Sequence, residues 1–434
     1  MRFDTALVAL AAVLPAVEAI PMKELFAKRT TPLVLPLNVK SGFRNKLYRP
    51  YNYLANVKTL PVIVGGSVQA SNSSSTSSDS ESSASSVDAS NDTEILGGKA
   101  YQQQFTVNVT IGTPPQDIEL LLDTGSSEIV VLTDACEACV TNGHSVLNYD
   151  QSTTYQSDNK SVQVNYGTGS GSGVEAVDMI GLGSDTIAFT WMNVQDSLLW
   201  YYLPDTVAGI FGMSWLWPLT TNTSLSMDLA HYYWPEPRFG IYFGEPTIPA
   251  GVNMSNVGQG TTYNAGELTL GGINTSRYTG DLNTMDLVTS DPQRWLVDLQ
   301  GIKVNGVDLP LNQSLGYATL VDSGNEGNRV GPVLCDKIKD IVNGTYYGTQ
   351  IMVPCNQTMS LSWTFNGVEY PMAERDIFNA PEYYHPGAGN CILSFSCTDS
   401  SANGYSYVVG SPFMRNVYSV FSYNPPSVAF GKLA

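Results

Sequence analysis

Two short motifs in this chain could carry acid–base chemistry, and each places an aspartate before a small hydroxyl residue and a glycine. The first begins at Asp123 in the segment "LLLDTGSS", and the second begins at Asp322 in "TLVDSGNEG". Each aspartate directly follows an apolar run that is typical of a buried strand. A single copy is weak evidence, because aspartate and glycine are ordinary turn residues. Two copies in matching settings predict two related halves that contribute one carboxyl group each.

The chemistry that suits such a pair is proton sharing. Two carboxyl groups in one site cannot both ionise easily, so one proton is shared and the pair titrates as a unit. The ionised carboxylate can then take a proton from a bound water, while the protonated carboxyl group polarises a peptide carbonyl. This mechanism needs no metal ion, no cofactor and no covalent intermediate. Asp123 and Asp322 are therefore the predicted catalytic residues.

Other residues with catalytic or metal-binding potential do not form a second site in the sequence. The three histidines, His144, His231 and His385, lie far from any serine or cysteine motif, which favours surface or core positions over a catalytic triad. The segment "CEAC" has no second cysteine pair with which to bind zinc. No metal site is predicted.

The composition favours a large exported protein that does not bind nucleic acid. With 434 residues the chain is too long for one ordinary core, so two folded units or one two-lobed body are expected. Its 39 acidic residues outnumber 21 basic ones, and the net charge of -18 argues against phosphate binding. Residues 1–19 read as a secretory signal, with Arg2, an apolar run and the small-residue site "VEA". The six cysteines and the N-x-Ser/Thr sequons agree with export, because disulfide bonds and N-glycosylation are features of secreted proteins.

Basic residues are concentrated ahead of an acidic body. Residues 20–66 form a basic leader, whereas the chain from Ile95 onward has 31 acidic and 12 basic residues. Residues 67–94 are mostly Ser with Asn and Asp, a composition that predicts a disordered linker. Two interpretations of the leader are open. It is either a solvated basic face without further role, or an inhibitory propeptide that charge holds on the acidic body and low pH releases.

Beyond the linker the sequence pattern is mainly β. Short alternating or apolar runs, such as "YQQQFTVNVTIG", "IELLLDTGSS" and "VYSVFSY", are separated by Gly, Pro and Asn. Long amphipathic helices are scarce. The best helical candidate is "CDKIKDIVNGTYY", which begins at Cys335.

These motifs, with others in the same order, resemble the pepsin-like aspartic proteases. "VTIGTPPQDIELLLDTGSS" is similar to the family's first catalytic loop, and "YGTGSGSG" is similar to the flap over its cleft. "VAGIFGMSW" and "YVVGSPFMRNVYSVFSYNPPSVAFG" are similar to the hydrophobic-hydrophobic-Gly segments behind the two loops, and "ELTLGGINTSRYTGDL" to the strand between the lobes. The resemblance extends from Tyr101 to Ala434. It implies a mainly β, bilobal fold with a catalytic cleft between two related lobes, at residues 95–276 and 277–434.

The resemblance also assigns roles to residues beside the aspartates. Thr124 and Ser323 would cross-link the loops beneath the aspartates, and the adjacent glycines would allow close backbone approach. Ser126 would hydrogen-bond Asp123, and its counterpart Asn325 keeps an N–H donor for the second aspartate. The implied loop-support residues are Thr124, Gly125, Ser126, Ser323, Gly324 and Asn325, and the implied flap and substrate-binding residues are Tyr166, Gly167 and Thr168.

A disulfide of the family occupies the place of Cys355 and Cys391. The short "CEAC" loop suits the pair Cys136–Cys139, and Cys335–Cys397 is the pair that remains.

Three positions depart from the family's usual pattern. Asn325 stands where a hydroxyl residue is usual, Val130 where a tryptophan usually hydrogen-bonds the flap tyrosine, and Ser411 where an aspartate is usual. The loop segment "EGNRVGP" also reaches its Gly-Pro one residue late, which adds charged residues where the family contacts substrate. These departures leave the efficiency of catalysis and the substrate preference open.

The sequence supports three functions. The first is a secreted aspartic endopeptidase, made as a zymogen and active on proteins or peptides at acidic pH. The second is a peptide-binding relative that kept the cleft but lost much of its turnover, and the third is a glycosylated cell-surface or wall protein. Retention of both aspartates favours the first. We expect a monomer outside the cell, or alternatively in a vacuole or cell wall, inhibited by its own propeptide and without cofactor, nucleic-acid partner or membrane anchor.

Overall fold

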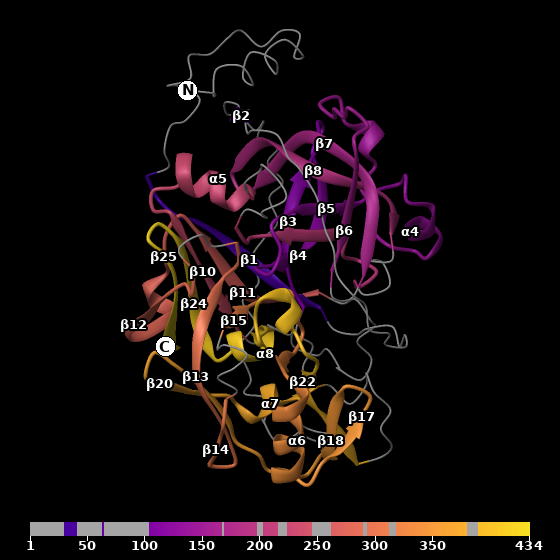
Figure 1. Ribbon diagram of the computed structural model, residues 1–434. Helices are drawn as coiled ribbons and strands as arrows, with labels where there is room; N and C mark the ends of the chain where they lie inside the picture. The colour runs from indigo at the N-terminus through magenta and orange to yellow at the C-terminus, as the bar shows by residue number, and fades with distance from the viewer. Residues whose placement is uncertain are drawn as a thin grey trace, which may run out of the picture.

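The computed structural model consists of two β-rich lobes that are connected by strands from both halves of the chain (Figure 1). Short helices lie between the strands. The prediction of a mainly β, two-lobed fold is confirmed. The predicted signal at 1–19 and the predicted linker at 67–94 lie outside the described residues. The structure describes residues 30–40, 63–64, 104–166, 169–197, 203–215, 224–244, 262–289, 293–311, 318–379 and 389–434.

The larger sheet has 14 strands within the described residues and extends from the N-terminal lobe across the junction of the lobes. Its order is β12-β25-β24-β10-β11-β1-β3-β4-β9-β5-β8-β7-β6, and β2 pairs with β8. Strands from both ends of the chain therefore meet in one sheet. Because this sheet contains strands from both sides of the expected lobe boundary at 276/277, that boundary stays a prediction. The strands are β1 (Leu33–Lys40), β2 (Ile63–Val64), β3 (Phe105–Ile111), β4 (Gln116–Asp123), β5 (Ile129–Leu132), β6 (Ser161–Asn165), β7 (Ser170–Leu182), β8 (Asp185–Ser197), β9 (Gly209–Gly212), β10 (Arg238–Phe243), β11 (Thr262–Leu270), β12 (Tyr278–Asp286), β24 (Val417–Tyr423) and β25 (Pro426–Leu433).

The second sheet has 11 strands in the described part of the chain and belongs to the C-terminal lobe. Its order is β17-β18-β22-β16-β23-β15-β13-β19-β20, with β14 on β13 and β21 on β22. The strands are β13 (Leu296–Val304), β14 (Val307–Leu309), β15 (Ala318–Val321), β16 (Asn328–Val330), β17 (Thr345–Tyr347), β18 (Gln350–Pro354), β19 (Leu361–Phe365), β20 (Val368–Pro371), β21 (Phe378–Asn379), β22 (Asn390–Cys397) and β23 (Tyr407–Val409).

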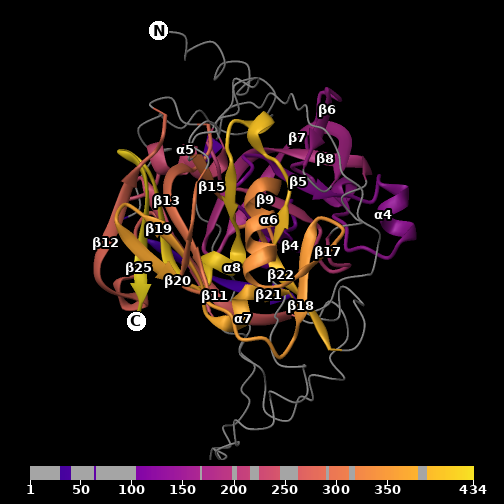
Figure 2. The ribbon, with the colours of Figure 1, turned by 60° about the horizontal axis from the view of Figure 1, so that its bottom comes forward.

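The α-helices are short, and three of them belong to the C-terminal lobe (Figures 1 and 2). The predicted helix at Cys335 is present as α6, but it begins earlier, at Pro332, and ends at Ile341. Asn343 then takes a left-handed φ of 48°, which ends the helical run, and the expected helical residues Thr345–Tyr347 form β17 instead. The helices are α4 (Glu137–Thr141), α5 (Leu225–Tyr232), α6 (Pro332–Ile341), α7 (Glu374–Ile377) and α8 (Ser411–Met414), and the 3-10 turns are Tyr149–Gln151, Thr275–Arg277 and Ser401–Asn403.

The basic leader contributes a strand to the larger sheet, which the sequence analysis did not foresee. β1 pairs with β11 along its length and with β3 at its C-terminal end. Its side chains alternate, because Leu33, Leu35 and Leu37 are buried while Val34 and Pro36 are exposed. One face of the leader strand is thus part of the hydrophobic core.

A buried tryptophan connects the backbones that carry the two aspartates. The indole N–H of Trp295 donates to the carbonyl of Met213 over 3.0 Å, and the Met213 N–H donates to the carbonyl of Asp123 over 2.8 Å. The backbone carbonyl of Trp295 accepts the N–H of Val321, the residue before Asp322, over 3.0 Å. Trp295 therefore fixes both strand ends. The rings whose centroids lie 5.0 to 5.8 Å from it are Trp215, Phe239, Phe421 and Tyr423.

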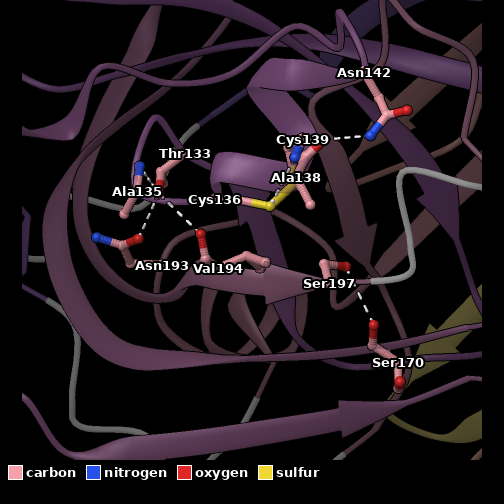
Figure 3. The surroundings of a disulfide bond; sticks show 10 residues. All are labelled: Thr133, Ala135, Cys136, Ala138, Cys139, Asn142, Ser170, Asn193, Val194 and Ser197. Carbon is pink, nitrogen blue, oxygen red and sulfur yellow. Dashed lines mark hydrogen bonds between the residues drawn. A yellow bond between two sulfur atoms is a disulfide. The ribbon is translucent and has the colours of Figure 1, made fainter.

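The six cysteines form three disulfides. The bridge between Cys136 and Cys139 closes the turn at the start of α4, beside β8 (Figure 3). The Thr133 hydroxyl next to this bridge lies 2.7 Å from Oδ1 of Asn193 and 2.9 Å from the carbonyl oxygen of Val194, which ties the turn to β8. The pairs are Cys136–Cys139, Cys335–Cys397 and Cys355–Cys391, the same pairs that the sequence analysis expects.

We predict that Trp295→Ala lowers the free energy of unfolding by about 3–5 kcal/mol, because it removes a large buried ring as well as a hydrogen bond. Trp295→Phe, the matched control, should lower it by only about 1 kcal/mol, since the Tyr423 hydroxyl also donates to the Met213 carbonyl. Urea denaturation measures both values. Equal losses in the two variants would contradict the structural role assigned to the ring.

Candidate active site

Two parallel strand pairs bring the aspartates to the junction of the lobes. β4 ends at Asp123 and runs parallel to β9, with Asp123 beside Gly212. β15 ends one residue before Asp322 and runs parallel to β23. Glycine permits close packing behind each loop, since a Cβ on Gly212 would lie 2.6 Å from the first loop and a Cβ on Gly410 only 2.2 Å from the second. The two halves thus use the same local arrangement.

Reciprocal hydrogen bonds lock the two loops together. The Thr124 N–H donates to the Ser323 hydroxyl, and the Ser323 N–H donates to the Thr124 hydroxyl, each over 2.9 Å. Each hydroxyl in turn donates to the opposite strand, Thr124 to the carbonyl of Val321 over 2.9 Å and Ser323 to that of Leu122 over 2.8 Å. Both side chains are buried, so water does not compete for these bonds. The network fixes the aspartates relative to one another.

The two carboxyl groups face each other across the glycines. A Cβ on Gly125 would lie 2.6 Å from the carboxyl group of Asp322, and a Cβ on Gly324 would lie 2.6 Å from that of Asp123. The glycine N–H groups also act as donors, Gly125 to Asp123 over 2.8 Å and Gly324 to Asp322 over 3.0 Å. Any side chain at either glycine would collide with the opposite carboxyl group.

The two aspartates differ in their hydrogen bonds and therefore in protonation. Asp123 accepts the Ser126 hydroxyl at 2.5 Å in addition to its glycine N–H. Burial, the negative charge of Asp123 and a hydrogen bond between the two carboxyl groups raise the pKa of Asp322 well above its usual value. The positive charge of Arg329 and the Gly324 N–H act in the opposite direction. Of the two carboxyl groups, Asp322 is the one whose surroundings favour the protonated form.

Asn325 supports the second loop, but not in the expected way. Its side-chain amide donates to the carbonyl of Gly327, and its Oδ1 accepts Arg329 over 3.0 Å. Its backbone carbonyl accepts both the N–H and the hydroxyl of Ser411, over 3.0 and 3.2 Å. The expectation that Asn325 donates to Asp322 is therefore wrong, because other partners satisfy its amide.

The predicted flap tyrosine lies in the turn that joins β6 to β7. The Tyr166 N–H donates to the carbonyl of Gly169 over 2.7 Å, and its side chain packs on a buried apolar cluster. Val130, in the position where the family has tryptophan, is completely buried in this cluster. Gly167 and Thr168 lie outside the described residues.

One polar contact of the second catalytic loop was not identified from the sequence. Gln104, just before β3, donates to Glu326 in the second loop. Burial raises the pKa of Glu326 to about 7, although the Gln104 hydrogen bond acts in the opposite direction. Burial also raises the pKa of Glu128, with a smaller contribution from the charge of Asp123. Glu326 belongs to the charged residues that the sequence analysis noted in "EGNRVGP", whereas the only signal for Glu128 was its place before an apolar run.

Comparison with known proteins identifies the family. The model of the eukaryotic aspartyl proteases matches residues 104–433. This chain belongs to the eukaryotic aspartyl protease family. Major aspartyl peptidase 1 of Cryptococcus neoformans var. grubii is 23% identical over 347 residues, which cover 76% of this chain and 68% of that protein. Pepsin A of Sus scrofa is 27% identical over 332 residues (73% and 78%), and cathepsin E of Aquarana catesbeiana is 26% identical over 337 residues (75% and 79%).

Family membership gives the fold and the class of reaction. The two-lobed arrangement is the pepsin-like fold, and the protein is an aspartic-type endopeptidase, a hydrolase. Both aspartate loops and the Tyr166 turn fall inside the matched residues, whereas the leader strand β1 precedes them.

We predict that Glu326→Gln removes part of the pH dependence of stability. The pKa of Glu326 is about 7 in the folded protein, against an ordinary 4.5. The stability that the protonated Glu326 side chain gives the fold is therefore complete below pH 4.5 and is lost as the pH rises to 7. The variant should therefore match the parent at pH 4 and exceed its free energy of unfolding at pH 7.5 by roughly 3 kcal/mol.

Urea denaturation at both pH values measures this difference. The exposed Glu137 of α4 provides the control Glu137→Gln, for which parent and variant should change in parallel with pH. A Glu326→Gln variant that also changes in parallel with its parent would show that Glu326 is ionised in the folded protein.

Proposed function

We propose that this aspartyl protease is a secreted endopeptidase, made as a zymogen, that hydrolyses proteins or peptides at acidic pH with Asp123 and Asp322 as its catalytic pair. The observation that carries the proposal is the pair of interlocked loops, which hold two hydrogen-bonded carboxyl groups in one site. Such a pair keeps one proton, as a water-activating mechanism requires.

In the proposed reaction, ionised Asp123 accepts a proton from a bound water while the oxygen of that water attacks the peptide carbonyl carbon. Asp322 gives its proton to the carbonyl oxygen, and a tetrahedral diol forms. Asp123 then passes its proton to the leaving nitrogen as the C–N bond breaks, and one diol hydroxyl returns a proton to Asp322. The donors on Asp123 suit the ionised member, and the raised pKa of Asp322 suits the protonated one.

The turn at Tyr166 is proposed as a flap over the substrate. Its packing on the apolar cluster around Val130 gives it a fixed base. Gly167 and Thr168 are proposed to contact substrate from the same turn. Closing such a turn would exclude water and strengthen the electrostatic interactions of the aspartates.

The leader is proposed as an inhibitory propeptide. Its strand β1 is paired on both edges, with β11 and β3, so the precursor folds with the leader as part of its sheet. The basic composition of residues 20–66 and the acidic body support attachment by charge, which protonation of carboxylates would weaken.

The signal at residues 1–19, the disulfides and the sequons support secretion, with a vacuole or cell wall as the alternative location, and we propose a glycosylated monomer. Among the described residues no helix is long and apolar enough to cross a membrane.

One observation favours a second candidate, a peptide-binding relative with weak turnover. The Asn325 side chain is engaged by Gly327 and Arg329, so Asp322 does not receive the donor that Ser126 provides to Asp123. The retained pair of carboxyl groups favours the enzyme, because a peptide binder does not need a shared proton.

We predict that Asp123→Asn and Asp322→Asn each lower kcat/KM by about 10²–10⁴-fold while the protein stays folded, since each removes one member of the proton-sharing pair. The parent should show a bell-shaped pH profile with its maximum on the acid side. Hydrolysis of a denatured protein, with near-ultraviolet circular dichroism as the folding check, measures this. Asp286→Asn, at an exposed position of β12, is the control and should keep parental activity. Parental rates in either catalytic variant, or an alkaline optimum, would refute the mechanism.

We predict that the precursor purified at pH 7 is latent and becomes active with a lag after transfer to about pH 4. Activation requires β1 to leave the sheet, and low pH reduces the charge that holds the leader. N-terminal sequencing during the lag should show the start of the chain moving beyond residue 40. A precursor that retains residues 30–40 and hydrolyses at the final rate without a lag would show that the leader is not inhibitory.

A further inference from the structure

The second aspartate has fewer hydrogen-bond donors than the first. Asp123 receives a hydroxyl donor, Ser126, in addition to a backbone N–H. Within the described residues, Asp322 receives only the Gly324 N–H and the hydrogen bond shared with Asp123. When the pair loses its last proton, both carboxyl groups are ionised. The Asp322 anion then lacks a neutral hydroxyl donor of the kind that stabilises the Asp123 anion.

A cation lies close to this aspartate. Arg329, in β16 between β22 and β23, reaches back along the loop and donates from its NH2 group to Oδ1 of Asn325 over 3.0 Å. Asn325 is itself held by Gly327 and Ser411, so the guanidinium is attached to a rigid part of the loop. The position of the positive charge relative to Asp322 is therefore fixed.

The contacts of Arg329 do not account for a purely structural role. Its Nε is buried and has no hydrogen-bond partner among the described residues, and no described carboxylate lies within ion-pair distance of its guanidinium. Holding a cation partly buried with so few partners is unfavourable unless a negative charge nearby offsets it. The candidate for that charge is the aspartate pair, since Arg329 interacts electrostatically with Asp322.

We propose that Arg329 is a positioning residue of this active site, and that its positive charge, held by Asn325, takes the place of the hydroxyl donor that Asp322 lacks. The inference deepens the proposed function and rests on it. Arg329 does not contact the reacting atoms in this proposal. It acts through its field, which favours the ionised form of the pair and sets the pH range in which one proton is shared.

Several other charged or titratable groups face the pair. Glu128 lies in the loop that follows β4 and Asp123. Tyr405, before β23, interacts with Asp322, and the Arg294 guanidinium lies 5.4 Å from the centroid of the Tyr405 ring. Glu326 is in the second loop and bonded to Gln104. Unlike these groups, Arg329 is linked by a hydrogen bond to Asn325, so its charge is held in place beside the second loop.

The test is the pH profile of kcat/KM for the activated protein on one neutral peptide. Removing a positive charge raises the pKa values of the pair, so Arg329→Met should move both limbs of the bell to higher pH by roughly one unit. Arg329→Lys, which keeps the charge, should move them by less than half as much. Arg329→Gln, which keeps an amide donor but no charge, should behave as Arg329→Met does. If Arg329→Met does not accumulate as a folded protein, the Lys and Gln variants give the same comparison.

Arg238→Met is the matched control, because Arg238 pairs with Glu236 on the surface near β10 and its loss changes the net charge equally. Its profile should coincide with that of the parent. Limbs that stay in place in Arg329→Met, while activity falls equally at every pH, would show a structural role only. An effect confined to KM for acidic peptides would make Arg329 a specificity residue and would also overturn the inference. A parent that neither cleaves peptides nor binds a statine-type peptide would instead refute the proposed function, and this inference with it.

Discussion

The reciprocal hydrogen bonds between Thr124 and Ser323 are the constraint on which the rest of this site depends. Two carboxyl groups that repel one another when ionised must be held at hydrogen-bonding distance, and the loops that carry them come from strands of different sheets. Four buried hydrogen bonds between Thr124, Ser323 and the opposite strands supply that restraint. Glycine beside each aspartate is then required, because any Cβ there would occupy the space of the opposite carboxyl group. Trp295 extends the restraint into the core, since it bonds to the backbone on both sides.

Burial dominates the electrostatics around this pair. Three acidic side chains, Glu128, Asp322 and Glu326, have raised pKa values, and desolvation is the largest cause for each. Surroundings that disfavour negative charge favour the protonated forms of these groups, and they make complete ionisation unfavourable to the fold. Ser126 and Arg329 oppose this tendency in different ways, the first through a neutral hydrogen bond and the second through a charge. The two halves of the site are thus similar in backbone and different in electrostatics.

The leader strand shows how the same sheet serves folding as well as catalysis. β1 lies between β11, which leads toward the junction of the lobes, and β3, which begins just after Gln104. The leader and the Gln104–Glu326 contact are therefore attached to the same strand. The C-terminal end of β1 thus pairs with the start of β3, one residue after the Gln104 that contacts the second catalytic loop.

The sequence by itself determined the local chemistry. It identified the two aspartates, the hydroxyl and glycine residues beside them and the mainly β class, because each depends on residue type and short-range order. The cysteine pairs, two of which span 36 and 62 residues, came from the resemblance to the family together with the short "CEAC" spacing. The leader strand also had a readable signal, the alternation of Leu33, Leu35 and Leu37, but the basic composition around it directed attention to charge. The helix at Cys335 was expected to start too late and to extend too far, since α6 begins at Pro332 and Asn343 ends the helical run through its backbone conformation.

Only the tertiary structure decided which partners the polar side chains choose. Asn325 has the donor that the sequence analysis assigned to Asp322, yet Gly327 and Arg329 lie where its amide group can bond to both. The contact between Gln104 and Glu326 spans 222 residues, so no local pattern could reveal it. Side-chain amides and guanidinium groups form hydrogen bonds only over about 3 Å. Which groups come that close depends on how the strands pack in space rather than on their order along the chain.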